Sequence, residues 1–411
     1  MTTDPLISRF LRPRLIEALG DTPVVLVHGP RQCGKTTLAQ TIKGYEYITF
    51  DDEVQLAAAQ ADPVGFVADL PKKVVLDEIQ RVPELFATLK AAVDRDRRPG
   101  RFILTGSANV LLAPKLSDSL AGRMELLRLH PLAQCEIAGV PSQFLRALFS
   151  AGFKARKYER LGRELAGRIV AGGYPAALAR ASGRRRRDWY RAYIETLVQR
   201  DVRDLTRISA LDALSRLLQL AAGQTGRLLN VSELAAPFQL SRPTIRDYVT
   251  LLERIFLIEL LPPWHSNRLS RLVKTPKLHL SDTGVAASLL GVDEAALWKD
   301  RALLGQLLET FVIQELRRQG SWYEDAIIFH HFRDKDGYEV DIVLEREGRD
   351  VAGVEIKAAA TVTESDFRGL RKLRDASGKR FAAGVVLYDG ESAVRFADDL
   401  FAVPITALWS G

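Results

Sequence analysis

The sequence is poor in cysteine and methionine and has no long apolar run. Its 411 residues include only two cysteines and two methionines. Two cysteines are too few for a disulfide framework or a cysteine-rich metal site. No apolar run approaches the roughly 18 residues of a membrane span, and the first ten residues lack the apolar centre of a signal peptide. We therefore expect a cytoplasmic protein with no membrane partner.

Acidic residues are scarce in one part of the chain, although the whole composition is that of a globular protein. Hydrophobic residues make up 47% and charged residues 27%, and the net charge is +7. Residues 1–140 carry 17 basic and 17 acidic side chains, residues 141–290 carry 25 and 12, and residues 291–411 carry 16 and 22. A basic middle segment favours a nucleic-acid contact surface. A basic interface with the acidic C-terminal part is the alternative.

The segment GPRQCGKT matches the phosphate-binding loop pattern G-x-x-x-x-G-K-[ST]. It follows an apolar strand-like run at 23–27 and precedes a helical segment, a context that argues against a chance glycine-rich turn. Its main-chain N–H groups can hold phosphates, with Lys35 on the β/γ-phosphates and Thr36 on Mg²⁺. Cys33 is expected to be a packed side chain. The predicted ATP-binding residues are Gly29, Pro30, Arg31, Gln32, Cys33, Gly34, Lys35, Thr36 and Thr37.

Short apolar strands alternate with helical patterns over the first 140 residues. This alternation predicts a parallel sheet with helices on both faces, so the fold class is α/β. One strand ends in Asp77 and Glu78. Asp77 can bind Mg²⁺ through water, and Glu78 can polarise the attacking water, which nucleotide binding alone would not require. The predicted strands are 24–27, 45–50, 74–76, 101–105 and 124–129.

Two further residues extend this hydrolytic site. Ser107 follows the fourth strand, where its hydroxyl can sense a γ-phosphate. Arg123 comes just before the fifth strand, and an arginine there can reach the nucleotide of a neighbouring subunit and neutralise charge in the transition state. That role requires a homo-oligomer; the alternative is a surface arginine in a turn.

The rest of the chain is expected to form three parts. Residues 141–225 read as helical, with an apolar stripe over 189–208 that we interpret as core. Residues 226–292 contain two short helical patterns and an extended segment. Residues 293–411 form a smaller α/β unit with a helix at 303–319, strands at 327–333, 338–345, 349–358, 381–388 and 401–408, and a helix after Ser365. With residues 1–140, this gives four predicted domains.

Residues 230–264 read as helix, turn, helix and an extended segment. Ser241 can cap the second helix, whose apolar residues from Ile245 onward face inward. Arg242, Thr244 and Arg246 would then point outward. The segment resembles a winged helix, whose second helix can enter a major groove of DNA. A packing module that never touches DNA is the alternative.

Residues 338–357 read as a β-hairpin with carboxylates on both strands. If residues 347–349 form its loop, Asp341 lies opposite Glu355, and Glu339 lies opposite Lys357. Two facing carboxylates repel one another unless a positive charge lies between them, and a divalent metal is the economical candidate. The alternative is a solvated hairpin with a Glu339–Lys357 cross-strand pair.

These motifs resemble two known families. The first half resembles AAA-type P-loop ATPases, and the whole chain is similar to a widespread prokaryotic family that joins such an ATPase to a C-terminal part of unknown function. The motifs that carry this resemblance include residues 172–175, 200–201, 281–284 and 305–357. Residues 172–175 are similar to a Gly-x-Pro element that approaches bound nucleotide, which implies a nucleotide contact for Pro175.

The C-terminal carboxylates resemble the restriction-endonuclease-like superfamily, whose pattern is an acidic residue, then Asp, then Glu-x-Lys. The resemblance implies that Glu309, Asp341 and Glu355 hold Mg²⁺, while Lys357 orients or activates water for phosphodiester attack. Arg333 and Glu339 would support them. Thr310 departs from the asparagine expected there. Members of this superfamily that keep the fold but only bind nucleic acid are a further alternative.

The sequence therefore predicts an oligomeric Mg²⁺-dependent ATPase that binds DNA and carries a nuclease-like domain, with ATP and Mg²⁺ as cofactors. The alternative is a nucleotide-controlled switch whose C-terminal domain is not catalytic. DNA-stimulated turnover and metal-dependent cleavage would favour the first. Slow turnover that is insensitive to DNA would favour the second.

Overall fold

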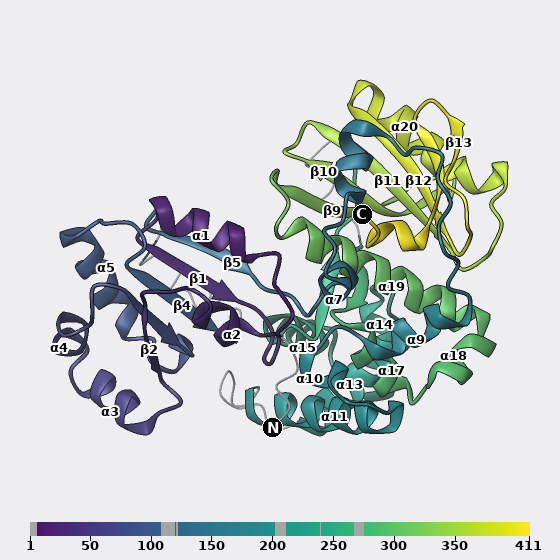
Figure 1. Ribbon diagram of the computed structural model, residues 1–411. Helices are drawn as coiled ribbons and strands as arrows, with labels where there is room; N and C mark the ends of the chain where they lie inside the picture. Colours follow the sequence, from purple (N-terminus) through teal and green to yellow (C-terminus); the bar gives the residue numbers. More distant parts are fainter. Residues whose placement is uncertain (1–5, 108–119, 121, 202–210, 239, 267–274) are drawn as a thin grey trace. The chain divides into compact units, whose positions relative to one another are not determined.

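The computed structural model describes residues 6–107, 120, 122–201, 211–238, 240–266 and 275–411 (Figure 1). The chain divides into two compact units. The first unit contains residues 1–132 with 254–256, and the second contains 133–253 with 257–411. None of the helices in the described part of the chain is long and apolar enough to cross a bilayer.

The first unit is built on a five-stranded parallel sheet. Its strand order is β2-β3-β4-β1-β5, and every neighbouring pair is parallel. Some strands that follow one another in the chain, such as β1 and β2, are not neighbours in the sheet. The connection between successive strands runs over a face of the sheet as a helix or a loop. The predicted parallel sheet and its five strands are confirmed. The strands are β1 (Val24–His28), β2 (Glu46–Thr49), β3 (Val74–Asp77), β4 (Phe102–Gly106) and β5 (Met124–Arg128).

Both faces of this sheet are covered by apolar side chains from helices. Because neighbouring residues of a strand point to opposite faces, Val75 and Ile103 pack against Ala39 on one face. Leu104 belongs to the core of the other face together with Leu89. The helices are α1 (Arg12–Asp21), α2 (Lys35–Gln40), α3 (Glu53–Ala61), α4 (Pro63–Ala68), the 3₁₀ turn η1 (Ile79–Arg81) and α5 (Leu85–Arg95).

The second unit begins with helices. The predicted apolar stripe runs along α11 and its continuation η4, where Tyr190, Ile194, Leu197 and Val198 are buried as expected. The rest of the stripe, Val202 and Leu205, lies outside the described residues. The helices are α7 (Gln134–Ala138), α8 (Phe144–Arg146), η3 (Ala147–Ala151), α9 (Arg163–Ala171), α10 (Pro175–Leu178), α11 (Gly183–Thr196), η4 (Leu197–Asp201) and α13 (Leu211–Gly223).

A helix-turn-helix follows, together with a small antiparallel sheet. Ser241 accepts the Thr244 N–H at 3.2 Å, which confirms it as the cap of α15. Ile245 and Leu252 are fully buried on the inner face. The sheet has the order β6-β8-β7. The elements are β6 (Arg227–Leu228), α14 (Val231–Ala235), η5 (Ala236–Phe238), α15 (Arg242–Arg254), β7 (Ile258–Leu261) and β8 (Lys277–Leu280).

The chain ends in a six-stranded mixed sheet with the order β13-β14-β12-β11-β10-β9. Two predictions for it were wrong: β13 was missed, and residues 405–408 form a 3₁₀ turn, η8, where a strand was expected. The elements before the sheet are α17 (Thr283–Leu290), α18 (Glu294–Lys299) and α19 (Arg301–Gly320). Those of the sheet are β9 (Ile327–Arg333), β10 (Glu339–Arg346), β11 (Asp350–Lys357), η6 (Glu364–Phe367), α20 (Arg368–Ser377), η7 (Gly378–Arg380), β12 (Phe381–Tyr388), β13 (Val394–Ala397), β14 (Leu400–Pro404) and η8 (Ile405–Leu408).

Candidate nucleotide site and carboxylate cluster

The phosphate-binding loop follows β1 directly and requires glycine at its first position. Gly29 has a φ of 153°, and a Cβ atom there would lie 2.1 Å from the carbonyl oxygen of Leu129. Gly34, which precedes α2, has a φ of 102°, in the left-handed region that favours glycine. Gln32 adopts a left-handed conformation without being glycine. Backbone of this kind turns successive N–H groups toward one concavity, where a phosphate can bind.

The loop is held in shape from both sides. The guanidinium of Arg9 donates to the carbonyl oxygens of Cys33, at 2.6 Å, and His130, at 2.7 Å. The Cys33 thiol is buried and donates to Leu129 O at 3.3 Å, in agreement with its predicted packing role. Lys35 Nζ is also buried and lies 2.8 Å from Pro30 O. An ammonium held over the loop carbonyls is within reach of phosphates bound by the same loop.

Asp77 receives hydrogen bonds from three hydroxyl groups. Thr36 Oγ1 donates to it at 3.0 Å, Tyr47 OH at 2.7 Å, and Thr105 Oγ1 donates as well. Burial raises the pKa of Tyr47, and its contact with Asp77 raises it further, so the phenol remains a donor. The Thr36 hydroxyl beside a carboxylate is a suitable pair of oxygen ligands for Mg²⁺ in company with phosphate.

Glu78 adopts a left-handed backbone conformation, with φ 58° and ψ 42°. Such strain in a non-glycine residue costs of order 1 kcal/mol and is concentrated at functional sites. The Glu78 carboxylate accepts hydrogen bonds from the Ser107 hydroxyl, at 3.2 Å, and from the Gln80 amide. The same amide lies 3.0 Å from Ser107 Oγ. Gln80 was not predicted; its only signal in the sequence is an amide two residues after Glu78.

Arg123 makes a bidentate contact with Asp94 of α5, at 2.7 and 3.1 Å. The residue after it, Met124, lies opposite Val24 at the start of β1. The phosphate-binding loop follows the other end of β1, so a strand of roughly 16 Å separates Arg123 from that edge of the sheet. Within the same chain Arg123 therefore lies away from the loop.

His28, the last residue of β1, was not predicted as part of this site. Burial, together with the nearby charges of Arg128 and Lys35, lowers its pKa to about 4. Its ring centroid lies 5.9 Å from that of Phe256, and the Arg128 guanidinium lies 5.0 Å from the Phe256 ring. An uncharged imidazole beside Lys35 adds no further positive charge to the loop at neutral pH.

The predicted hairpin of β10 and β11 is confirmed in both register and loop length. Ile342 pairs with Val354, and Arg346 pairs with Asp350 across the three-residue turn. Asp341 Oδ2 accepts the Ile356 N–H at 3.0 Å. We refer to Glu309, Asp341 and Glu355 as the carboxylate cluster.

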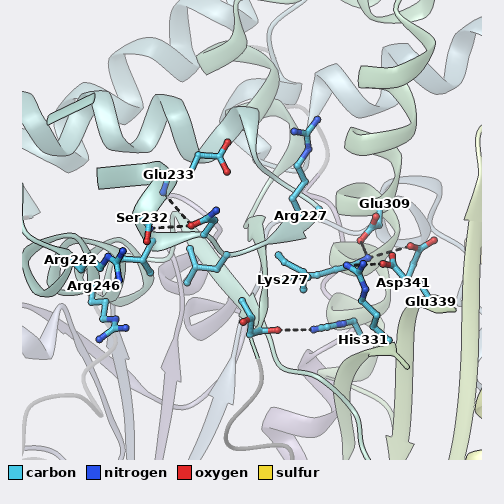
Figure 2. A pocket seen from close by; sticks show the side chains of 17 residues that line it. Arg227, Ser232, Glu233, Arg242, Arg246, Lys277, Glu309, His331, Glu339 and Asp341 are labelled. Carbon is cyan, nitrogen blue, oxygen red and sulfur yellow. Dashed lines mark hydrogen bonds and ion pairs between the residues drawn. The ribbon is translucent and has the colours of Figure 1, made fainter. Parts of the chain in front are cut away.

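A lysine reaches into this cluster. Lys277 Nζ lies 2.8 Å from Glu309 Oε1 and 3.3 Å from Asp341 Oδ1 (Figure 2). Lys277 belongs to β8, and the exposed fraction of its side chain is 7%. Burial raises the pKa of Glu309, and Asp341 raises it further, while Lys277 opposes the shift. The sequence predicted a positive charge between Asp341 and Glu355, and the lysine found here lies instead between Glu309 and Asp341.

Glu339 and Lys357, at the open end of the hairpin, are not paired with each other. Lys357 Nζ lies 3.3 Å from Glu355 Oε1 and 3.6 Å from Asp366. Glu339 pairs with Arg333 of β9 at 3.0 Å, so the alternative of a Glu339–Lys357 cross-strand pair is wrong. The reason is that Glu339 lies where β10 pairs with β9, before the described pairing with β11 begins.

Two members of the carboxylate cluster, Glu309 and Asp341, line one cavity of the second unit together with the two arginines predicted to bind DNA, and its volume is about 760 Å³ (Figure 2). Arg242 and Arg246 approach it from α15 and are exposed as predicted. Thr244 is half-buried, and its hydroxyl lies 2.8 Å from Ser241 Oγ, so it takes part in the helix cap. The charged lining residues are Arg227, Glu233, Arg242, Arg246, Lys277, Glu309, Arg333, Glu339 and Asp341.

Family models match most of the chain. A model described as an AAA domain matches residues 21–138, and two domains of unknown function, DUF8612 and DUF4143, match residues 162–296 and 304–408. The uncharacterized proteins Rv2008c of Mycobacterium tuberculosis and Mb2031c of Mycobacterium bovis are each 32% identical over 400 residues. The alignment covers 95% of this chain and 82% of each relative. The chain belongs to the family of these mycobacterial proteins.

This family member is a P-loop ATPase of the AAA type, because the AAA match covers the loop, Asp77 and Glu78. Among solved structures, the Walker-type ATPase PABY2304 of Pyrococcus abyssi is 17% identical with a TM-score of 0.45. That comparison covers 69% of this chain and 96% of the other.

In this family member, the 172–175 segment is fixed within the second unit. Pro175 begins α10, and the preceding Gly173 N–H donates to Asp282 at 2.8 Å. Asp282 is fully buried and pairs with Arg318 at 3.0 Å, and Arg318 also pairs with Glu315. The two motifs at 172–175 and 281–284 therefore meet in a buried ion network, and no described contact tests the predicted nucleotide contact of Pro175.

The carboxylate cluster of this family member does not fit a divalent metal as arranged. Among the described residues, no group of three or more His, Cys, Asp or Glu side chains is placed to hold a metal ion. Lys277 takes one oxygen each from Glu309 and Asp341, and a backbone N–H takes the other Asp341 oxygen. Glu355 Oε2 is buried without a hydrogen-bond partner in the described part of the chain.

Proposed function

We propose that this protein is a Mg²⁺-dependent ATPase that binds DNA through the cavity of its second unit and couples ATP turnover to that binding. The observation that supports DNA binding is the meeting of Arg242, Arg246 and Arg227 in one cavity. Arginines held in this way bind phosphate oxygens regardless of base sequence. The positive charge of residues 141–290 supports the same role.

In the ATPase site, each residue has a chemical task. The loop and Lys35 bind the phosphates, and Thr36 and Asp77 hold Mg²⁺. Glu78 orients and polarises the attacking water, while Ser107 contacts the γ-phosphate and the Glu78 carboxylate.

Oligomer formation is part of this proposal. Arg123 lies at the opposite edge of the sheet from its own loop, so it can stabilise transition-state charge only at the nucleotide of another subunit. Before Arg123 contacts the nucleotide of another subunit, Asp94 would hold its guanidinium in place.

The finer proposal is that the C-terminal domain cuts DNA only in a state in which Lys277 has left Glu309 and Asp341, with Lys357 assisting the attack of water on the phosphodiester. Its test is Mg²⁺-dependent nicking of supercoiled DNA by the wild type and by Lys357→Ala, with Lys379→Ala as the exposed control. Nicking that disappears only in Lys357→Ala supports cleavage. Nicking that persists in that variant indicates a contaminating nuclease and contradicts the assignment.

A second candidate is a nucleotide-controlled switch with a nuclease-like domain that binds without cutting. The position of Lys277 between Glu309 and Asp341 favours this candidate. It predicts slow ATP turnover that DNA does not change, together with an assembly size that depends on the bound nucleotide. Light scattering with ADP and with a non-hydrolysable ATP analogue measures that size.

A further inference from the structure

Lys277 joins two structural elements that lie far apart in sequence. It comes from β8 of the small antiparallel sheet, whereas Glu309 comes from α19 and Asp341 from β10. The exposed fractions of the two carboxylate side chains are 15% and 17%, and that of Lys277 is 7%. Charged groups this deeply buried are stable only when they are paired.

The ammonium and a divalent ion would compete for the same two oxygens. Mg²⁺ binds carboxylate oxygen at about 2.0–2.1 Å and requires near-octahedral geometry. The Lys277 ammonium already lies 2.8 Å from Glu309 Oε1 and 3.3 Å from Asp341 Oδ1. A cation bound to both oxygens would therefore touch the ammonium, and the two positive charges would repel strongly where water is scarce.

The Asp341 carboxylate has little freedom to change its orientation. Its Oδ2 accepts the Ile356 N–H, which fixes the carboxylate against the neighbouring strand.

We propose that Lys277 is the resident cation of the carboxylate cluster, and that a divalent ion binds Asp341 only when the Lys277 side chain has withdrawn. The proposed function supplies the comparison with metal-dependent nucleases on which this inference rests. In such nucleases the carboxylates bind the metal directly. Here the protein supplies its own cation, so the cluster is closed to metal in the described arrangement.

The test is Mn²⁺ binding to the nucleotide-free full-length protein, measured by electron paramagnetic resonance of free Mn²⁺. The variants are Lys277→Ala, Lys277→Arg, Asp341→Asn and Lys277→Ala combined with Asp341→Asn. Lys299→Ala, an exposed lysine at the end of α18, is the matched control. Thermal unfolding followed by circular dichroism shows whether each variant is folded.

We expect Lys277→Ala to bind one additional Mn²⁺ at least tenfold more tightly than the wild type, and the double variant to lose that ion. Lys277→Arg and Lys299→Ala should match the wild type. The inference is overturned if the folded Lys277→Ala variant gains no ion. It is also overturned if the wild type already binds an ion that Asp341→Asn removes. This second comparison does not depend on whether a Lys277 variant folds.

This test involves neither ATP nor DNA, so its outcome is separate from that of the proposed function. A protein with the expected Mn²⁺ pattern but no response of turnover to DNA would refute DNA coupling and retain the inference. DNA-stimulated turnover, together with a Mn²⁺ ion bound to Asp341 in the wild type, would support DNA coupling and refute the inference.

Discussion

Glu78 combines backbone strain with a side chain held by two donors. Its left-handed backbone turns the carboxylate away from the direction that β3 would give it, and Ser107 and Gln80 fix it there. A general base is effective only when its carboxylate is held within hydrogen-bond reach of the attacking water. At the scale of single residues, we therefore expect Gln80 to act as a positioning residue for Glu78.

Gln80→Ala should lower kcat for ATP about tenfold, the equivalent of one lost hydrogen bond to a charged group, with little change in KM. The reason is that Gln80 contacts Glu78 and Ser107, not the loop and Lys35 that hold the phosphates during binding. Steady-state turnover against ATP concentration separates the two constants. Gln60→Ala, an exposed glutamine of α3, is the control. A kcat equal to that of the control would show that Gln80 does not position Glu78.

Much of the ATPase site was predictable because its residues lie in short local motifs. The loop 29–36 and the pair Asp77 and Glu78 are contiguous in sequence, and strand ends in a parallel sheet meet at one edge. The Gln80 contact was not predictable in the same way. It depends on Ser107, a residue 27 positions away that follows another strand.

At the scale of elements, α15 presents two arginines to the cavity. Arg242 and Arg246 are one helical turn apart, so they lie on the same exposed side of α15, next to the buried face that holds Ile245. A pair spaced in this way can contact successive phosphates of a nucleic-acid backbone.

Arg242→Ala and Arg246→Ala should each weaken DNA binding and reduce the slope of log affinity against log salt by about 1, because each phosphate contact releases about one counterion. Fluorescence anisotropy with a labelled duplex at several salt concentrations measures both quantities. Arg184→Ala, an exposed arginine of α11, is the matched control. Unchanged slopes in both cavity variants would exclude phosphate contacts by this face.

The β10–β11 hairpin shows where prediction from sequence succeeds and where it fails. Its register was predictable because the three-residue turn and the two-residue period of a strand fix which residues face each other. The cation beside Asp341 was not predictable, because Lys277 lies 64 positions earlier in the chain and arrives from a different sheet. Opposed carboxylates predict that a cation lies near them, but they do not predict whether it is a metal ion or a basic side chain.

At the scale of the whole molecule, the position of Arg123 requires a second subunit if it is to take part in hydrolysis. Mixing Arg123→Ala with Lys35→Ala should therefore restore ATP turnover above the sum of the separate variants. In a mixed assembly, the intact Arg123 of one variant meets the intact loop of the other. Turnover measured across mixing ratios tests this, after the subunits have been allowed to exchange.

The recovery of ATP turnover should be greatest near equal amounts of Arg123→Ala and Lys35→Ala. It should be absent when Lys35→Ala is mixed with a variant that carries both substitutions. A mixture no more active than its separate components would place Arg123 outside the hydrolytic site and leave its contact with Asp94 as a surface ion pair.

In the proposed function, ATP hydrolysis in the first unit responds to DNA bound by the second. The most direct measurement is steady-state ATP turnover with and without duplex, single-stranded and branched DNA, using Glu78→Gln to define the background. We predict a severalfold increase with at least one DNA in the wild type and none in Glu78→Gln. We also predict a reduced increase in the Arg242→Ala, Arg246→Ala double variant at unchanged basal turnover. Turnover that is the same with and without every DNA would contradict the account.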